Sequence, residues 1–501
     1  MPDTEDVEVD TAAGRVRGRW RSDPDGRMPR SAAFLGIPFA EPPVGPLRFQ
    51  APVPHSPWQG VRDALGHGAT AQRGDQGDTL IPEPSVEGDS TLNVNVFTPD
   101  PAASELPVLV WIHGGGFTSG SPASPWYDGR AFARDGVVTV TLSYRLGFDG
   151  FGWIEDAPSN RGVRDWLLAL EWVQQNIAAF GGDPRRVTIA GQSAGGGAVL
   201  TLLGMPAAQH LFHGVYAISS ALTDVAASRA EAFGRRLAAS AGGEPTVAGW
   251  SDVDEERVLA LQKAATRVAP QEMATLIDDG LTLGPVVDGD LIPRPTRESL
   301  RAGVGADKPL VLGATDDEFT MVFGGAVAKA LRWVPRGLLL DRLGLDRSIR
   351  SEYLAANADV VRLGKSRLAG RVITDRLFRA GVLRVAADRG EAPTWVYRFS
   401  WPSGRFGFAE HCLDVPFFFD CLDGPGIEAL AGPHPPQQLA DEVHAGAVSF
   451  ITAGDPGWPR HEGDAGVVRI YDARTRDEAD AYATVRPLLG AVSESAAAQA
   501  M

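Results

Sequence analysis

The chain has 501 residues, of which 44% are hydrophobic and 22% charged, and a formal net charge of −16 at pH 7. These proportions are typical of a soluble globular protein, and a single large α/β enzyme often reaches this length. The negative charge argues against nucleic acid and anionic membranes as partners, because both would repel the surface.

The N-terminus and the cysteines bear on the cellular compartment. Residues 1–10, MPDTEDVEVD, lack the basic and apolar regions of a secretion signal, and no apolar run approaches the roughly 20 residues of a membrane helix. Cys412 and Cys421 are too few for a disulfide framework or a typical zinc site, and a bridge between them stays open. We expect a cytoplasmic protein without metal or cofactor, either a monomer or a weak homo-oligomer.

The first 150 residues are expected to be mainly extended. Residues 7–20 alternate apolar and polar side chains around a glycine turn, which predicts a hairpin. Residues 34–52 are rich in proline, so we expect an extended strap on the surface. Residues 107–117 and 137–147 contain continuous apolar runs, as in strands that are buried on both faces of a sheet.

The following part of the chain alternates between helix and strand. Apolar residues between positions 163 and 177 recur at helical spacing, and a second helix is predicted over 194–203. Further strands are predicted over 186–191, 214–220, 308–315 and 394–401. This order predicts an α/β fold, with a mostly parallel central sheet and helices on both of its faces.

Two helical and more polar stretches interrupt this alternation. They cover about residues 221–277 and 326–389, and we interpret them as insertions that cap one end of the sheet. A single domain over residues 1–490 is therefore expected, followed by a disordered tail over 491–501.

A serine lies among glycines in the segment RVTIAGQSAGGGAVL, residues 186–200. Gly191, Ser193 and Gly195 form the pattern G-x-S-x-G between a predicted strand and a predicted helix. There a strained turn would expose the serine hydroxyl as a nucleophile. A tightly packed turn with the serine as a helix cap would give the same pattern.

A nucleophilic serine needs a histidine base and a carboxylate that orients it, and in α/β-hydrolases these follow the serine in the order acid, histidine. His411 lies in a loop before a phenylalanine run that could exclude water. Asp316, Asp317 and Glu318 follow a predicted strand, where sheet enzymes gather catalytic groups. The sequence pattern alone leaves all three carboxylates as candidates for the acid.

Three glycines follow the predicted strand over 107–112, in the segment HGGGF at residues 113–117. Their backbone N–H groups can turn toward one point and form an oxyanion hole. A flexible turn or a phosphate-binding loop is the alternative, but the lysine and Ser/Thr of a P-loop are missing.

Together these segments resemble the type-B carboxylesterases, the family of the cholinesterases and the bacterial p-nitrobenzyl esterases. The resemblance covers most of the chain, and the segments that carry it are 34–49, 92–99, 110–121, 143–147, 160–196, 284–293 and 411–419. It implies the α/β-hydrolase fold and an esterase that forms an acyl-enzyme on a small-molecule ester.

The resemblance also implies residue roles. It makes Ser193 the nucleophile, His411 the base and Glu318 the acid, with Asp317 as the fallback. The oxyanion hole would consist of the residues Gly115, Gly116 and Ala194, and Ser220 matches a serine that supports the acid.

Two departures from the family pattern concern the substrate. Gln192 stands where the family often has a glutamate beside the nucleophile, which weakens the attraction for a choline ester. Phe319 follows the acid where a small residue is usual. With Phe117 and Phe408 nearby, we expect an apolar pocket that accepts uncharged esters with short or medium acyl or aryl groups. The residues expected to contact the substrate are Phe117, Gln192 and Phe319.

Two alternative functions remain open at this point. An amidase or carbamate hydrolase would use the same triad, because the difference lies in leaving-group protonation and pocket shape. A non-catalytic binding protein on the same fold is less expected, because such proteins normally lack the serine.

Overall fold

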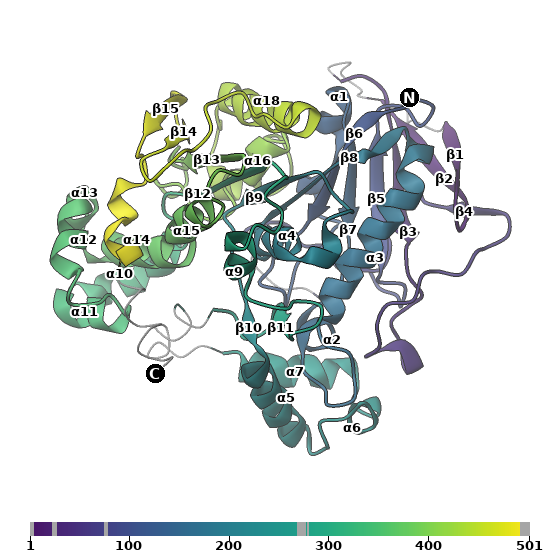
Figure 1. The fold of residues 1–501 in the computed structure, drawn as a ribbon, viewed down its shortest axis with the longest axis horizontal. Helices are drawn as coiled ribbons and strands as arrows, with labels where there is room; N and C mark the ends of the chain where they lie inside the picture. The colour runs from purple at the N-terminus through teal and green to yellow at the C-terminus, as the bar shows by residue number, and fades with distance from the viewer. Residues whose placement is uncertain (1–4, 23–27, 75–78, 268–276, 278–279, 491–501) are drawn as a thin grey trace.

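A computed structural model describes residues 5–22, 28–74, 79–267, 277 and 280–490. The predicted tail over 491–501 and part of the first predicted insertion lie outside the described residues. A twisted sheet runs through the centre, with helices on both sides (Figure 1).

Within the described residues this sheet has 13 strands. In spatial order they are β1 (Asp6–Thr11), β2 (Gly14–Arg21), β3 (Ser31–Pro38), β5 (Asn93–Thr98), β7 (Val138–Leu142), β6 (Leu106–Ile112), β8 (Gly182–Gln192), β9 (Gly214–Ile218), β12 (Leu310–Thr315), β13 (Thr394–Phe399), β14 (Val467–Tyr471) and β15 (Arg476–Ala479), with β4 (Val61–Asp63) paired to β2. The strands from β7 to β14 are parallel, and the pairs toward both ends are antiparallel except for β4, which is parallel to β2. The predicted mostly parallel sheet is thus confirmed.

The N-terminal hairpin is confirmed, because β1 pairs antiparallel with β2 in a register that places Val9 opposite Val16. The expectation for residues 34–52 is wrong over its first part. Phe34 and Ile37 are buried in β3, which pairs with β5. The strand tolerates Pro38 because this proline is its last residue, where a missing N–H costs little.

Each face of the sheet has its own core. Along β6, Val108 and Val110 belong to one cluster of buried side chains, whereas Leu109 and Trp111 belong to the other. This alternation is the two-residue period of a strand, and every residue of β7, β9 and β12 is buried because both faces are covered.

Helices from several parts of the chain cover the two faces. The first core contains side chains of α3 (Arg161–Asn176), α4 (Ala194–Gly204) and α15 (Ala380–Asp388). The second contains side chains of α1 (Arg130–Arg134), α16 (Val415–Phe418) and α18 (Gln437–Ala453). Shorter helices are α2 (Gly147–Phe151), α9 (Thr296–Arg301), α17 (Ile427–Ala431) and α19 (Pro487–Gly490).

Helices also occupy both stretches where the sequence predicts insertions. Between β9 and β12 lie α5 (Ala227–Ala241), α6 (Val247–Ser251), α7 (Glu255–Ala265) and the short parallel pair β10 (Val225–Ala226) and β11 (Val286–Val287). Between β12 and β13 lie α10 (Gly325–Leu331), α11 (Arg336–Arg342), α12 (Arg350–Ala356), α13 (Ala358–Arg362), α14 (Lys365–Thr374), a π-helical turn (Asp375–Arg379) and α15. In Figure 1 the two groups project from different parts of the sheet.

Candidate active site

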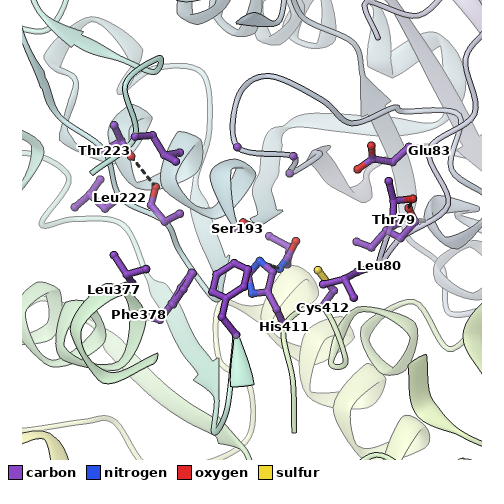
Figure 2. Close-up of a pocket in the computed structure, with 18 of the residues that line it drawn as sticks. Thr79, Leu80, Glu83, Ser193, Leu222, Thr223, Leu377, Phe378, His411 and Cys412 are labelled. Atoms are coloured by element: carbon purple, nitrogen blue, oxygen red, sulfur yellow. Dashed lines mark hydrogen bonds between the residues drawn. The ribbon is translucent and has the colours of Figure 1, made fainter. Parts of the chain in front are cut away.

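A cavity of about 370 Å³ lies where β8 meets α4, and both Ser193 and His411 line it (Figure 2). In this view Leu222, Thr223, Leu377 and Phe378 lie on one side of Ser193, and residues 79, 80 and 83 lie on the other. The wall is mostly apolar and is assembled from segments that are far apart in the sequence. The size and apolar character are those of a small-molecule site.

Ser193 occupies the strained turn between β8 and α4. Its backbone angles are φ 58° and ψ −121°, which are rare for a residue with a side chain. A Cβ atom on Gly195 would lie 2.0 Å from the Ile112 carbonyl oxygen, and one on Gly191 would lie 2.4 Å from the Gly195 carbonyl oxygen. The glycines therefore permit close packing of the turn against β6, and the turn exposes the half-buried serine to the cavity.

The glycine loop after β6 lies beside Ser193. Gly115 and Gly116 have φ angles of 107° and 61°, which a glycine adopts without strain, and both line the cavity. Ala194 is the first residue of α4. Among the described residues, the N–H groups of Gly115, Gly116 and Ala194 have no backbone or side-chain acceptor, so they are available to an oxyanion.

Glu318 is the carboxylate that contacts His411. The Nδ1 atom of His411 donates to Glu318 Oε2, and the backbone N–H of His411 donates to the Glu318 carbonyl oxygen at 2.9 Å. The other carboxylate oxygen accepts the Thr315 N–H at 2.9 Å, and Glu318 is fully buried. These bonds fix the proton of a neutral imidazole on Nδ1 and leave Nε2 as an acceptor.

The other two carboxylates of the trio face elsewhere. Asp316 pairs with Arg398 at 2.5 Å, and Asp317 pairs with Arg367 at 3.2 Å and Arg371 at 3.4 Å. The geometry therefore separates the three candidates that the sequence pattern left open, and only Glu318 is bonded to the histidine.

Burial and neighbouring groups act in opposite directions on His411. Burial alone lowers its pKa, but the Cys412 thiol and the Glu318 carboxylate raise it, and the balance holds the pKa well above the ordinary value. The base is thus expected to titrate on the alkaline side of an ordinary histidine.

Gln192 contacts Nε2 of His411, the ring nitrogen that is not bonded to Glu318. Its side-chain Nε2 lies 3.1 Å from His411 Nε2, and Gln192 is buried. Among the described hydrogen bonds none joins the Ser193 hydroxyl to His411, although both side chains line the same cavity. The Gln192 amide therefore contacts the ring nitrogen of His411 that is not bonded to Glu318.

Aromatic rings enclose the histidine. Phe319 stacks on the His411 ring, with centroids 4.9 Å apart, and Phe378 packs at 5.2 Å. Both phenylalanines line the cavity, so the predicted position of Phe319 in the pocket agrees with the structure. Phe378 could not be identified from the sequence as part of the cavity wall, because in the insertion it resembles an ordinary core residue of an amphipathic helix.

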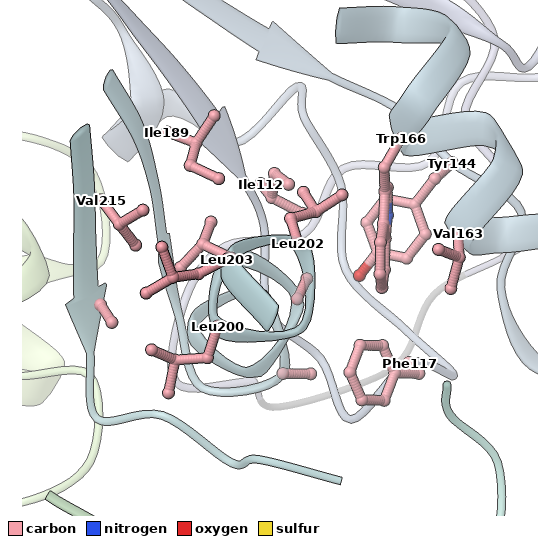
Figure 3. Close-up of a cluster of buried hydrophobic side chains, with 14 of the residues drawn as sticks. Ile112, Phe117, Tyr144, Val163, Trp166, Ile189, Leu200, Leu202, Leu203 and Val215 are labelled. Atoms are coloured by element: carbon pink, nitrogen blue, oxygen red, sulfur yellow. The ribbon is translucent and has the colours of Figure 1, made fainter. Parts of the chain in front are cut away.

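Phe117 does not line the cavity, which corrects the expectation for this residue. It is fully buried, with its ring 5.1 Å from Phe151 and 6.0 Å from Trp166, within the cluster of Figure 3. Its φ angle of 60° marks the turn after the glycines, which directs the side chain into the core. Phe408 packs against the guanidinium of Arg367 and is likewise absent from the cavity wall.

Ser220 makes no hydrogen bond to Glu318, which corrects its expected supporting role. Its buried hydroxyl has no hydrogen-bond partner among the described residues, and it lies against Gly196 in the first turn of α4. The Glu318 oxygens are bonded by His411 and Thr315 instead.

Cys412 and Cys421 are both free thiols, so the bridge that the sequence left open does not form. Cys412 is buried, follows the base directly and lines the cavity, and burial raises its pKa. Within the described ranges, no three His, Cys, Asp or Glu side chains are grouped to hold a metal ion.

Comparison with known proteins assigns the chain to a family. The sequence profile of the Carboxylesterase family matches residues 5–465. The chain belongs to this family. It is 34% identical to the para-nitrobenzyl esterase of Bacillus subtilis (strain 168), over 89% of this chain and 92% of the relative. It is 33% identical to the phenmedipham hydrolase of Pseudarthrobacter oxydans, over 87% and 90%.

Solved structures agree with the assignment. A PNB esterase superposes with a TM-score of 0.81 at 30% identity, covering 96% of this chain and 99% of the other. A carboxylesterase of Geobacillus stearothermophilus superposes with a TM-score of 0.80 at 30% identity and the same coverage. The protein is thus an α/β-hydrolase and a carboxylesterase that cleaves carboxylic esters as a serine hydrolase. None of its described helices is both long and apolar enough to span a membrane.

Proposed function

We propose that this carboxylesterase hydrolyses esters with short or medium acyl or aryl groups, through an acyl-enzyme on Ser193. The observation that carries the proposal is the position of His411, which is bonded to Glu318 on one side and lines a small apolar cavity with Ser193 on the other. The cavity volume of about 370 Å³ suits a substrate of this size.

In the proposed mechanism, the Ser193 oxygen attacks the ester carbonyl carbon while its proton passes to His411 Nε2. For this step the Gln192 amide leaves Nε2. The N–H groups of Gly115, Gly116 and Ala194 stabilise the oxyanion that forms.

Collapse of this intermediate breaks the ester C–O bond, and the leaving alcohol takes the proton from His411. Water then attacks the acyl-enzyme with His411 as the base, which releases the acid and restores Ser193. Glu318 stabilises the imidazolium in both halves of the reaction.

A fluorophosphonate probe tests the proposal, because it labels only an activated serine. Covalent labelling is expected in the wild-type enzyme but not in Ser193→Ala. The control is Ser219→Ala, which should still be labelled because Ser219 is a buried residue directly after β9, the neighbour of β8. Labelling of Ser193→Ala at the wild-type rate would contradict the assignment of the nucleophile.

We also propose a cytoplasmic location. Its support is that both cysteines are free thiols, as is usual in a reducing compartment.

A further inference from the structure

The cavity wall contains a carboxyl group with no charged partner. Glu83 lies between β4 and β5 and lines the cavity, and in Figure 2 it lies on the side opposite Leu222 and Thr223. Its Oε2 atom is buried and has no hydrogen-bond partner, and no ion pair of Glu83 is found among the described residues. Neither lysine nor arginine is among the described residues that line the cavity.

The backbone around Glu83 is tied to the glycine loop. The Gln72 side chain donates to the Glu83 carbonyl oxygen at 2.8 Å and accepts the Gly120 N–H at 2.6 Å. The Thr79 hydroxyl donates to the Ile81 carbonyl oxygen at 2.6 Å. These bonds hold the segment in place, so the carboxyl group stays in the cavity wall.

A buried carboxyl group without a partner is unfavourable when it is ionised. Burial raises the pKa of Glu83 to about 7, against a smaller opposing effect of the Gly120 backbone N–H. A cationic group with an N–H donor would supply both the missing charge and the missing hydrogen bond.

We propose that Glu83 binds a protonated amine carried by the ester substrate, which departs from the uncharged esters expected from the sequence. The inference rests on the proposed function, which places the ester carbonyl at Ser193. The substrate is then an ester with a primary, secondary or tertiary amine, separated from the carbonyl by an apolar part that fits the remaining wall. A quaternary ammonium has no N–H and cannot donate a hydrogen bond to Oε2, so choline esters are expected to be poor substrates.

The test compares esters that differ only in the cation. The series consists of phenyl acetates that carry, at ring position 4, a chain of one to three methylenes ending in an ammonium group. Each is matched by a phenyl acetate in which a methyl group replaces the ammonium group. The ratio of kcat/KM between the members of a pair is measured at pH 8, where most Glu83 is ionised. Using a ratio cancels any general loss of activity in a variant.

For at least one chain length, the amine-to-alkyl ratio is expected to fall about tenfold or more from the wild type to Glu83→Gln. Glu87→Gln is the matched control, because Glu87 is exposed on the same segment, and it should leave the ratio unchanged. Equal ratios in the wild type and Glu83→Gln at all lengths would overturn the inference and leave the proposed function intact.

A second measurement needs only the wild-type enzyme and so does not depend on folding of the variant. The ester with a trimethylammonium group should react about tenfold more slowly than the preferred primary ammonium ester. Equal rates would overturn the role of the N–H donor. If the wild type failed to hydrolyse the neutral alkyl esters, the proposed function itself would fail.

Discussion

Gln192 contacts the ring nitrogen of His411 that the proposed mechanism uses, because its amide nitrogen lies 3.1 Å from His411 Nε2. A neutral amide at this place does not change the charge on the ring. A carboxylate there would attract the imidazolium form, so a charge at residue 192 would add to the effects of Cys412 and Glu318 on the pKa of His411.

Gln192→Glu is expected to shift the pH profile of kcat/KM. The base must be neutral, so in the wild type kcat/KM rises with pH through an apparent pKa above the ordinary histidine value of about 6.5. A carboxylate beside Nε2 raises this apparent pKa further, by about one unit, and lowers the activity on neutral esters at pH 7. Gln192→Leu serves as the uncharged control, and an unmoved profile in Gln192→Glu would contradict the contact.

The contrast between adjacent carboxylates gives a second prediction. Ser193→Ala and His411→Ala should each reduce kcat by several orders of magnitude. Glu318→Gln should be less severe, and it should move the apparent pKa of the base down because it removes the carboxylate at Nδ1. Asp317→Asn should lower the thermal stability and leave kcat nearly unchanged, since Asp317 pairs with two arginines and not with His411. A greater loss of kcat in Asp317→Asn than in Glu318→Gln would assign the acid to Asp317.

At the scale of elements, the junction of β8 with α4 depends on contact between backbones. The first turn of α4 lies so close to β6 that residue 195 has no room for a side chain. This part of the fold could be predicted from the sequence, because a strand, a G-x-S-x-G turn and a helix follow one another without interruption. By contrast, β3 was missed over residues 34–38, because proline content outweighed a short apolar run whose partner β5 lies far along the chain.

Two glycine substitutions should therefore have opposite effects on stability. Gly195→Ala places a Cβ atom 2.0 Å from a carbonyl oxygen and should destabilise the fold by about 2 kcal/mol or more. Gly381→Ala lies in α15 with no atom within 4 Å of its added Cβ, and should stabilise the fold by roughly 0.5–1 kcal/mol. Thermal unfolding of both variants measures the difference, and a neutral Gly195→Ala would show that the junction relaxes.

At the scale of the molecule, the candidate site is assembled from loops that the sheet brings together. Ser193 could be predicted from its motif and His411 from the loop that holds it, whereas the choice of Glu318 among three adjacent carboxylates depended on the family resemblance. The wall could not, because Glu83, Leu222 and residues 377–378 have no pattern that relates them in sequence. Phe117 was expected in the cavity wall because it directly follows the glycines of HGGGF, but its side chain is buried in the core.

The limited volume of the apolar cavity leads to a prediction for chain length. With p-nitrophenyl esters from acetyl to palmitoyl, each methylene that fits adds at most about 0.8 kcal/mol. The value of kcat/KM should rise modestly to a maximum at short or medium acyl chains and then fall, because the volume is about 370 Å³. A maximum at palmitoyl would instead indicate a lipase.

Residues 316–318 join three parts of the molecule within one short stretch. Asp316 is attached to β13 through Arg398, Asp317 to α14 of the second helical stretch through Arg367 and Arg371, and Glu318 to the base. An exchange of residues 326–389 with those of a relative therefore replaces Arg367 and Arg371, the ion-pair partners of the residue next to Glu318. A chimera without the two arginines should lose thermal stability, as Asp317→Asn should, before any change of substrate range can be observed.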